Sequence, residues 1–151
     1  MFNYLTAKTI GTVLFIFTIA AIWLTILIVF TDISINKNIM SIFIFLLISI
    51  LFNVSLSMFI TSFIDKEEEL VLISNIFIFI NAIIGGSIIP IQMMPDALQR
   101  ISIISPNYWM IRGFLYFQTG FNIKEGLLIG VSMIIISIVF LIFTGKGFRY
   151  E

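Results

Sequence analysis

The sequence predicts an all-α membrane protein, a polytopic helix bundle with four transmembrane helices and two short re-entrant or interfacial helices before the last span. Hydrophobic residues make up 60% of the chain, against roughly 45–50% in soluble domains, and charged residues make up 11%, against roughly 25%. Long charge-free runs alternate with short charged segments, and one stretch, residues 85–113, holds all three prolines. Residues 1–151 are therefore expected to form one multi-pass domain in the cell membrane.

The composition excludes several classes of function. Eight basic and eight acidic side chains give no net charge, so nothing favours a nucleic-acid partner. The chain has no cysteine and no histidine, which excludes disulfides, thiol chemistry, the usual zinc sites and imidazole catalysis. It also lacks a phosphate-binding loop of the GxxxxGK[ST] form. We expect no enzyme activity and no cofactor, and any energy input is expected to come from a partner or a gradient. The Ile-, Phe- and Asn-rich usage indicates an AT-rich bacterial genome.

Four charge-free apolar runs are predicted to cross the bilayer. The first, residues 10–30, would measure about 31 Å as a helix, close to the roughly 30 Å thickness of the hydrocarbon core. It follows Lys8 but is longer than the apolar region of a signal peptide, and no cleavage site follows it, so we expect it to remain as an anchor. The other predicted spans are residues 40–64, 70–87 and 126–143.

An acidic run precedes the third predicted span. It consists of Asp65, Lys66, Glu67, Glu68 and Glu69. Asp65 and Glu68 have the spacing of a capping box, and acidic side chains in a first helical turn suit the positive end of the helix dipole. The run is compatible with two interpretations: a surface that contacts an ATPase subunit, or a solvated turn that caps the span without a partner.

Residues 85–113 predict a break in the membrane helix. Gly85 and Gly86 leave the backbone unconstrained, and Pro90 removes a backbone donor and clashes with the preceding turn. The segment is too polar to cross a bilayer and too apolar for water, so it is expected to lie at the interface or dip partway into the membrane.

Two short helices are expected within and after this break, over residues 96–105 and 107–117. Ser105 followed by Pro106 has the pattern of an N-cap and a first helical residue. Tyr108 and Trp109 then fall where aromatic belts lie, at the level of the lipid headgroups.

Polar residues recur every fourth position along the second span and form a stripe on one helix face: Ser49, Asn53, Ser57 and Thr61. The stripe is compatible with a lining of a transport path, or with hydrogen bonding inside a packed bundle, including bonds to the helix's own backbone. Asn75 and Asn81 on the third span join it as candidate path residues, because an unpaired amide in hydrocarbon is costly.

Three further features leave alternatives open. Gly126 and Gly130 have the spacing of a close helix contact, within this bundle or between two such bundles. Arg100 and Arg112 are suited to an anionic substrate or headgroup, or simply to snorkelling. No carboxylate pair lies inside a span, so proton-coupled transport has no support.

The break region carries a resemblance to a known family. The pattern consists of Gly85, Gly86, Pro90, Met94, Pro95, Leu98, Ser105, Pro106, Asn107, Tyr108, Trp109 and Gly113. It resembles the C-terminal half of the ATP-binding-cassette exporter permeases of the second type. The resemblance implies that the four spans correspond to family spans three to six, and that residues 85–113 form an outer gate. It also implies two paired permease halves, each served by a separate ATPase subunit, with surrounding membrane lipids as further partners.

The resemblance also implies an orientation in the membrane and shows which family segments have no counterpart in this chain. The basic residues divide four against four between the two sides, so the positive-inside rule does not decide, and the family topology places both termini and the acidic run in the cytoplasm. The first two family spans and the ATPase-coupling segment are missing. The chain is therefore expected to be a C-terminal fragment, a split-gene product or a truncated gene. The alternative function is a small four-span interaction or immunity protein without transport activity.

Overall fold

The computed structural model describes residues 2–30, 39–119 and 122–147, and each regular element within them is a helix. In chain order these are α1 (Phe2–Phe30), α2 (Ile39–Thr61), α3 (Glu67–Ile84), the 3-10 helix η1 (Ile91–Met93), α4 (Asp96–Ser102), α5 (Pro106–Thr119) and α6 (Ile123–Gly147). The predicted fold class, an all-helical membrane bundle, is confirmed.

Three of the described helices are long and apolar enough to cross a membrane, over Ala7–Ile26, Met40–Thr61 and Ile123–Gly145. They correspond to the first, second and fourth predicted spans. The helix α3 has 18 residues, about 27 Å, but its first turn consists of three glutamates. Its crossing of the membrane stays a prediction.

The helices begin and end at somewhat different residues from the predicted spans. The helix α1 starts at Phe2 and α6 extends past both predicted ends, because backbone hydrogen bonding continues beyond the apolar run that marks the lipid-facing part. By contrast, α2 stops at Thr61 rather than residue 64, and α3 stops at Ile84, directly before the two glycines.

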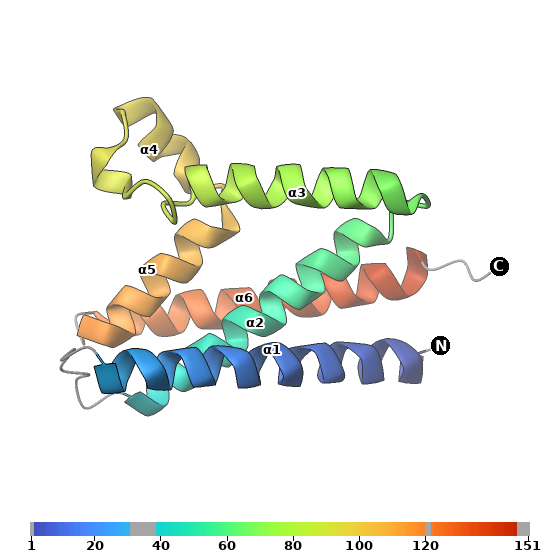
Figure 1. The fold of residues 1–151 in the computed structure, drawn as a ribbon, viewed down its shortest axis with the longest axis horizontal. Helices are drawn as coiled ribbons and strands as arrows, with labels where there is room; N and C mark the ends of the chain where they lie inside the picture. Colours follow the sequence, from blue (N-terminus) through green and yellow to red (C-terminus); the bar gives the residue numbers. More distant parts are fainter. Residues whose placement is uncertain (1, 31–38, 120–121, 148–151) are drawn as a thin grey trace.

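The long helices lie in two groups, and two helices cross obliquely from one group to the other (Figure 1). The helices α1 and α6 lie along one side, α3 lies along the other, and α2 and α5 run obliquely between them. The helix α2 packs against α1, α5 and α6, whereas α3 packs against α4 and α5. The first turns of α1 and α3 lie at one end of the molecule, and η1 and α4 lie at the opposite end.

The core is centred on Phe45 of α2, which is 2% exposed. Its ring lies 5.2 Å from the ring of Phe117 on α5, measured between centroids. A Cβ atom added to Gly113 of α5 would overlap the Phe45 ring. The absence of a side chain at Gly113 therefore lets α5 approach α2 closely enough to bury this phenylalanine.

The glycine pair of α6 faces the same core. A Cβ atom at Gly126 would lie 3.1 Å from the Phe117 ring, and one at Gly130 would lie 3.7 Å from Ile48 and 3.8 Å from Phe45. Both glycines thus contact residues of this chain, as the interpretation of packing within the bundle predicts.

Away from this core, most large apolar side chains of α1, α3 and α6 are exposed, as expected of helices that face lipid. The helix α1 contacts α2 through a smaller cluster of Val13, Ile50 and Val54. Near its start, the Thr9 hydroxyl lies 3.3 Å from the sulfur of Met58. These contacts fix the register of α1 on α2.

The predicted capping box at Asp65 and Glu68 is wrong. The helix α3 begins at Glu67, Lys66 occupies the N-cap position, and no side chain caps the first turn. Asp65 lies outside the helix, and the ammonium of Lys66 forms an ion pair with Glu69 at 3.0 Å. The three glutamates still occupy the first turn, where the helix dipole favours them.

The contact between Gly113 and Phe45 predicts that alanine destabilises the protein at position 113 but not at position 11. We expect Gly113→Ala to lower the free energy of unfolding by about 1–3 kcal/mol, because a methyl group would overpack a filled core. The control is Gly11→Ala on α1, where an added Cβ meets nothing within 4 Å. Thermal unfolding in detergent, followed by circular dichroism, measures both, and equal effects would contradict the packing described here.

Candidate functional site

The break predicted at residues 85–113 is present. Gly85 follows the last residue of α3 and donates its N–H to the carbonyl of Asn81 at 2.8 Å, and Ser87 donates to Ala82 at 3.1 Å. Gly86 has a positive φ of +89°, a backbone conformation that glycine adopts more readily than other residues. The two glycines therefore end α3 and turn the chain away from its axis.

The end of α3 touches the start of α5 at Gly85. A Cβ atom there would overlap the Cβ of Asn107 and would lie 2.6 Å from both the Ser105 hydroxyl oxygen and the Asn81 carbonyl. The hydroxyl of Ser105 donates to the side-chain oxygen of Asn81 at 3.0 Å, and the amide of Asn107 donates to the Ser87 hydroxyl at 3.3 Å. Only glycine at position 85 allows this approach.

Each of the three prolines lies at the N-terminal end of a helical element. Pro90 precedes η1, Pro95 precedes α4, and Pro106 is the first residue of α5. Met94 is buried, and its carbonyl accepts a hydrogen bond from the Gln99 amide at 2.8 Å, whereas Leu98 is exposed. The segment is thus a folded, helical return of the chain from α3 to α5 (Figure 1).

Aromatic side chains line the first turns of α5. The indole N–H of Trp109 donates to the Ile103 carbonyl at 2.7 Å, and its ring stands perpendicular to that of Tyr108. Arg112 donates to the hydroxyl of Tyr116 at 2.8 Å and to that of Tyr108 at 2.5 Å. These bonds, that to Tyr116 above all, raise the pKa of Arg112, so this position carries a fixed positive charge.

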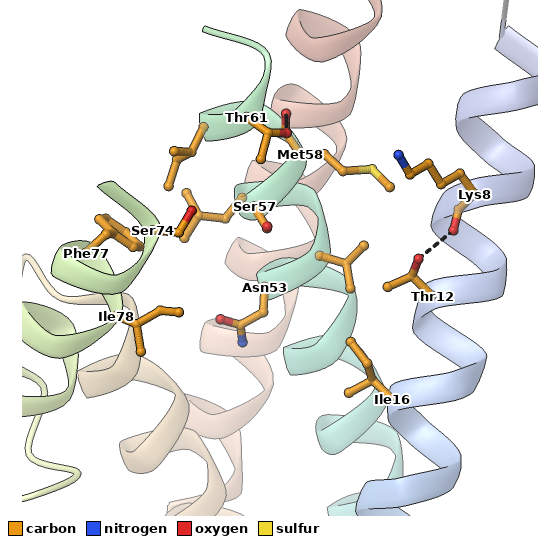
Figure 2. Close-up of a pocket in the computed structure, with 13 residues that line it drawn as sticks. Lys8, Thr12, Ile16, Asn53, Ser57, Met58, Thr61, Ser74, Phe77 and Ile78 are labelled. Atoms are coloured by element: carbon orange, nitrogen blue, oxygen red, sulfur yellow. Dashed lines mark hydrogen bonds between the residues drawn. The ribbon is translucent and has the colours of Figure 1, made fainter. Parts of the chain in front are cut away.

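A cleft of about 470 Å³ lies between α1, α2 and α3 (Figure 2). The helix α2 forms its floor, and the walls come from α1 and from α3. Three residues of the predicted polar stripe line it: Asn53, Ser57 and Thr61. The fourth stripe residue, Ser49, and both Asn75 and Asn81 are outside the lining; Asn75 is exposed on α3, and Asn81 is bonded at the break.

Most polar groups of the stripe are bonded within α2. The hydroxyls of Ser49 and Thr61 donate to the carbonyls of Phe45 and Met58, at 2.9 and 3.0 Å. The amide of Asn53 donates to the Ser49 carbonyl and also lies 2.9 Å from the sulfur of Met110 on α5. Hydrogen bonding inside the bundle is therefore present for Ser49, Asn53 and Thr61, whereas the lining of a transport path stays a prediction.

Sequence reasoning missed three polar residues of the cleft: Lys8 and Thr12 on α1, and Ser74 on α3. Lys8 and Thr12 are four residues apart and so share a helix face, which was the one signal available in the sequence. Nothing in the sequence places Ser74 opposite α2, because that depends on the packing of α3.

The acidic run is exposed at all five positions, from Asp65 to Glu69. Apart from the ion pair between Lys66 and Glu69, no ion pair involves these residues within the part of the chain that the structure describes. The run is thus available for a partner, and it is equally well solvated without one.

The contact at Gly85 predicts that cysteines placed after the end of α3 and at the start of α5 can be cross-linked. The chain has no cysteine, so Ser87→Cys with Asn107→Cys should react with a short bifunctional maleimide, because the two native side chains are hydrogen-bonded. Adding Gly85→Leu should remove most of the cross-linked product, because leucine would separate α3 from α5. Gly11→Leu serves as the control, and unchanged cross-linking in Gly85→Leu would show that the two helix ends do not depend on this glycine.

Comparison with known proteins identifies the family of the chain. Residues 1–119 match the family described as ABC-2 type transporter, which covers α1 to α5 and leaves α6 outside the match. The resemblance to this family that the sequence predicted is confirmed. No curated protein and no solved structure matched the chain. Since 119 of the 151 residues match, the chain belongs to the ABC-2 type transporter family, and it is a membrane permease component of the ATP-binding-cassette class.

Proposed function

We propose that this chain is a permease subunit of an ATP-binding-cassette exporter, in which residues 85–113 form the outer gate. The observation that carries the proposal is the glycine-dependent contact between the end of α3 and the start of α5, within a chain of this family. The chain moves a lipid-like, peptide-like or drug-like substrate across the membrane. A separate ATPase subunit binds the ATP and supplies the energy.

The gate depends on a small number of bonds at one helix junction. Gly85 and Asn107 are in contact, and the Ser105 hydroxyl is bonded to Asn81. ATP binding by the partner subunit closes two paired permease halves, which form a homodimer or a heterodimer. The accompanying movement of α3 relative to α5 breaks this junction and opens the outer side.

The proposed orientation places both termini and the acidic run in the cytoplasm. The family topology is the basis for the cytoplasmic side. The described helices are compatible with it, since the first turns of α1 and α3 share one end and the folded segment with η1 and α4 lies at the other. The acidic run then faces the ATPase subunit, and the gate faces outward. Asn53, Ser57 and Thr61, which border the cleft, line the inner part of the path.

The gate proposal predicts loss of transport when the break is removed. We expect the variant with Gly85→Leu, Gly86→Leu and Pro90→Leu to lose export, because α3 would continue as a helix and the contact with α5 would be blocked. The measurement is a mass-spectrometric comparison of exported compounds in cells that lack the chain, express it, or express the variant.

The control for that experiment is Gly11→Leu, which lies in open space on α1 and should retain export. A triple variant with full activity would overturn the gate and would favour the alternative, a small interaction or immunity protein that transports nothing. Failure of the wild-type chain to co-purify with any ATPase would reject the whole proposal.

The acidic run predicts a salt-dependent contact with the ATPase. We expect Glu67→Gln with Glu68→Gln and Glu69→Gln to weaken co-purification of the ATPase between about threefold and about a hundredfold at low salt, since each exposed charge pair contributes about 0.2–1 kcal/mol. The effect should shrink at high salt because of screening. Glu125→Gln, at the start of α6, is the control, and an unchanged yield would identify the run as a solvated turn.

A further inference from the structure

Arg112 and two tyrosines form a cluster along one face of α5. Tyr108, Arg112 and Tyr116 follow one another at intervals of four residues, so their side chains share a helix face. The guanidinium carbon lies 5.7 Å from the centroid of the Tyr108 ring and 5.6 Å from that of the Tyr116 ring. Both distances are within the range of a cation–π contact. The arginine is thus held between a tyrosine that precedes it and a tyrosine that follows it.

Hydrogen bonds fix the orientation of the guanidinium. Its Nε donates to the Tyr116 hydroxyl at 2.8 Å, and its Nη1 donates to the Tyr108 hydroxyl at 2.5 Å. An arginine that only extends toward the membrane surface needs neither bond. Because the side chain is already ordered, a ligand that binds to it causes little further loss of conformational entropy.

The cluster retains hydrogen-bond donors that have no acceptor. A guanidinium has five N–H groups, and Arg112 donates two of them to the tyrosines, so three remain. Each tyrosine hydroxyl accepts a bond from Arg112, which leaves its own hydrogen to donate. Among the residues that the structure describes, none accepts these remaining hydrogens. The free donors therefore lie together around one guanidinium.

The positive charge of the cluster has no counter-ion within the described part of the chain. The ion pair found there joins Lys66 to Glu69, and no carboxylate is among the groups that shift the pKa of Arg112. The tyrosine hydroxyls are neutral, so they orient the guanidinium without cancelling its charge. A ligand that matches the cluster has negative charge and several acceptor oxygens. A phosphate group has both, and arginine binds it through two parallel hydrogen bonds.

The position of the cluster suits a ligand at the membrane surface. The helix α5 runs to the start of α6, at the end of the molecule opposite the first turns of α1 and α3 (Figure 1). Trp109, whose ring stands perpendicular to that of Tyr108, adds a third amphipathic aromatic side chain to α5. Tyrosine and tryptophan are enriched at the level of the lipid headgroups. Lipid phosphates lie at the same level.

We propose that Tyr108, Arg112 and Tyr116 form a binding site for one phosphate group. The free N–H groups of Arg112 and the two tyrosine hydroxyls donate hydrogen bonds to the phosphate oxygens. The phosphate belongs to a phospholipid headgroup or to a soluble phosphate compound, since both present the same oxygens. This site goes beyond the proposed function, because it requires neither an ATPase nor movement at the junction between α3 and α5.

The test is lipid retention by the purified chain in a neutral detergent, measured by native mass spectrometry. Phosphatidylglycerol and diacylglycerol with the same acyl chains are offered at equal concentration, and we expect phosphatidylglycerol to be retained in preference. Arg112→Gln should lower its retention at least about tenfold, because charge-assisted hydrogen bonds are lost. Tyr108→Phe with Tyr116→Phe keeps the charge and both rings, and should lower retention at least about fivefold through the loss of the hydroxyls.

A second arm of the experiment distinguishes the two sources of the phosphate. Millimolar inorganic phosphate is added to the chain with phosphatidylglycerol bound. Retention that persists assigns the site to a lipid headgroup, because the acyl chains then contribute to binding. Displacement of the lipid assigns the site to soluble phosphate compounds, provided that Arg112→Gln also abolishes the effect of phosphate.

Matched variants separate the cluster from general surface charge. Arg100→Gln removes an exposed arginine of α4 that lies outside the cluster, and it should leave retention unchanged. Arg112→Lys keeps the charge but lacks the planar fork of donors, so it should lower retention. Unchanged helix content by circular dichroism shows that each variant is folded.

Three results would overturn the proposal. One is equal retention of phosphatidylglycerol and diacylglycerol by the wild-type chain. Another is an equal loss for Arg100→Gln and Arg112→Gln, which would mean that any exposed arginine suffices. The third is unchanged retention in the variant with both tyrosines replaced, which would show that the arginine acts as a charge alone.

Discussion

The burial of Phe45 is the contact on which the remaining architecture depends. The ring lies where α5 and α6 both meet α2, against Gly113 of one helix and Gly130 of the other. Bulky side chains at these positions would push the helices apart, so the close packing comes from small residues rather than from specific bonds. Because α2 is held in this way, its polar stripe has a fixed direction, and Asn53, Ser57 and Thr61 border the cleft.

Polar groups elsewhere in the bundle are largely satisfied by their own helices. The hydroxyls of Thr18, Thr25 and Ser132 each donate to a carbonyl four residues earlier. This removes the cost of a bare donor in hydrocarbon without requiring a partner helix. One exception is the Ser105 hydroxyl, which bonds across to Asn81 of α3.

Local sequence signals predicted the breaks and the helix starts well. Two glycines and a proline end α3, and Pro106 begins α5, since both effects act through the backbone of a few neighbouring residues. The capping box failed because its spacing is also found where the helix starts one residue later, with Lys66 rather than Asp65 at the N-cap. The sequence did not reveal the cleft, because the positions of Lys8 and Ser74 on its two walls depend on how α1 and α3 pack around α2, which no short pattern encodes.

The helix α3 belongs to both of the regions that the structure distinguishes. Its early turns carry Ser74 and Phe77 into the cleft, and its last turn carries Asn81 to the bond with Ser105. The stretch between them is a continuous helix, so displacement of one end is transmitted to the other. A ligand that binds the cleft more tightly in one position of α3 would shift the equilibrium between the two positions by the difference between its two binding free energies. Because the coupling is reciprocal, a change at the junction with α5 would alter the affinity of the cleft by the same amount.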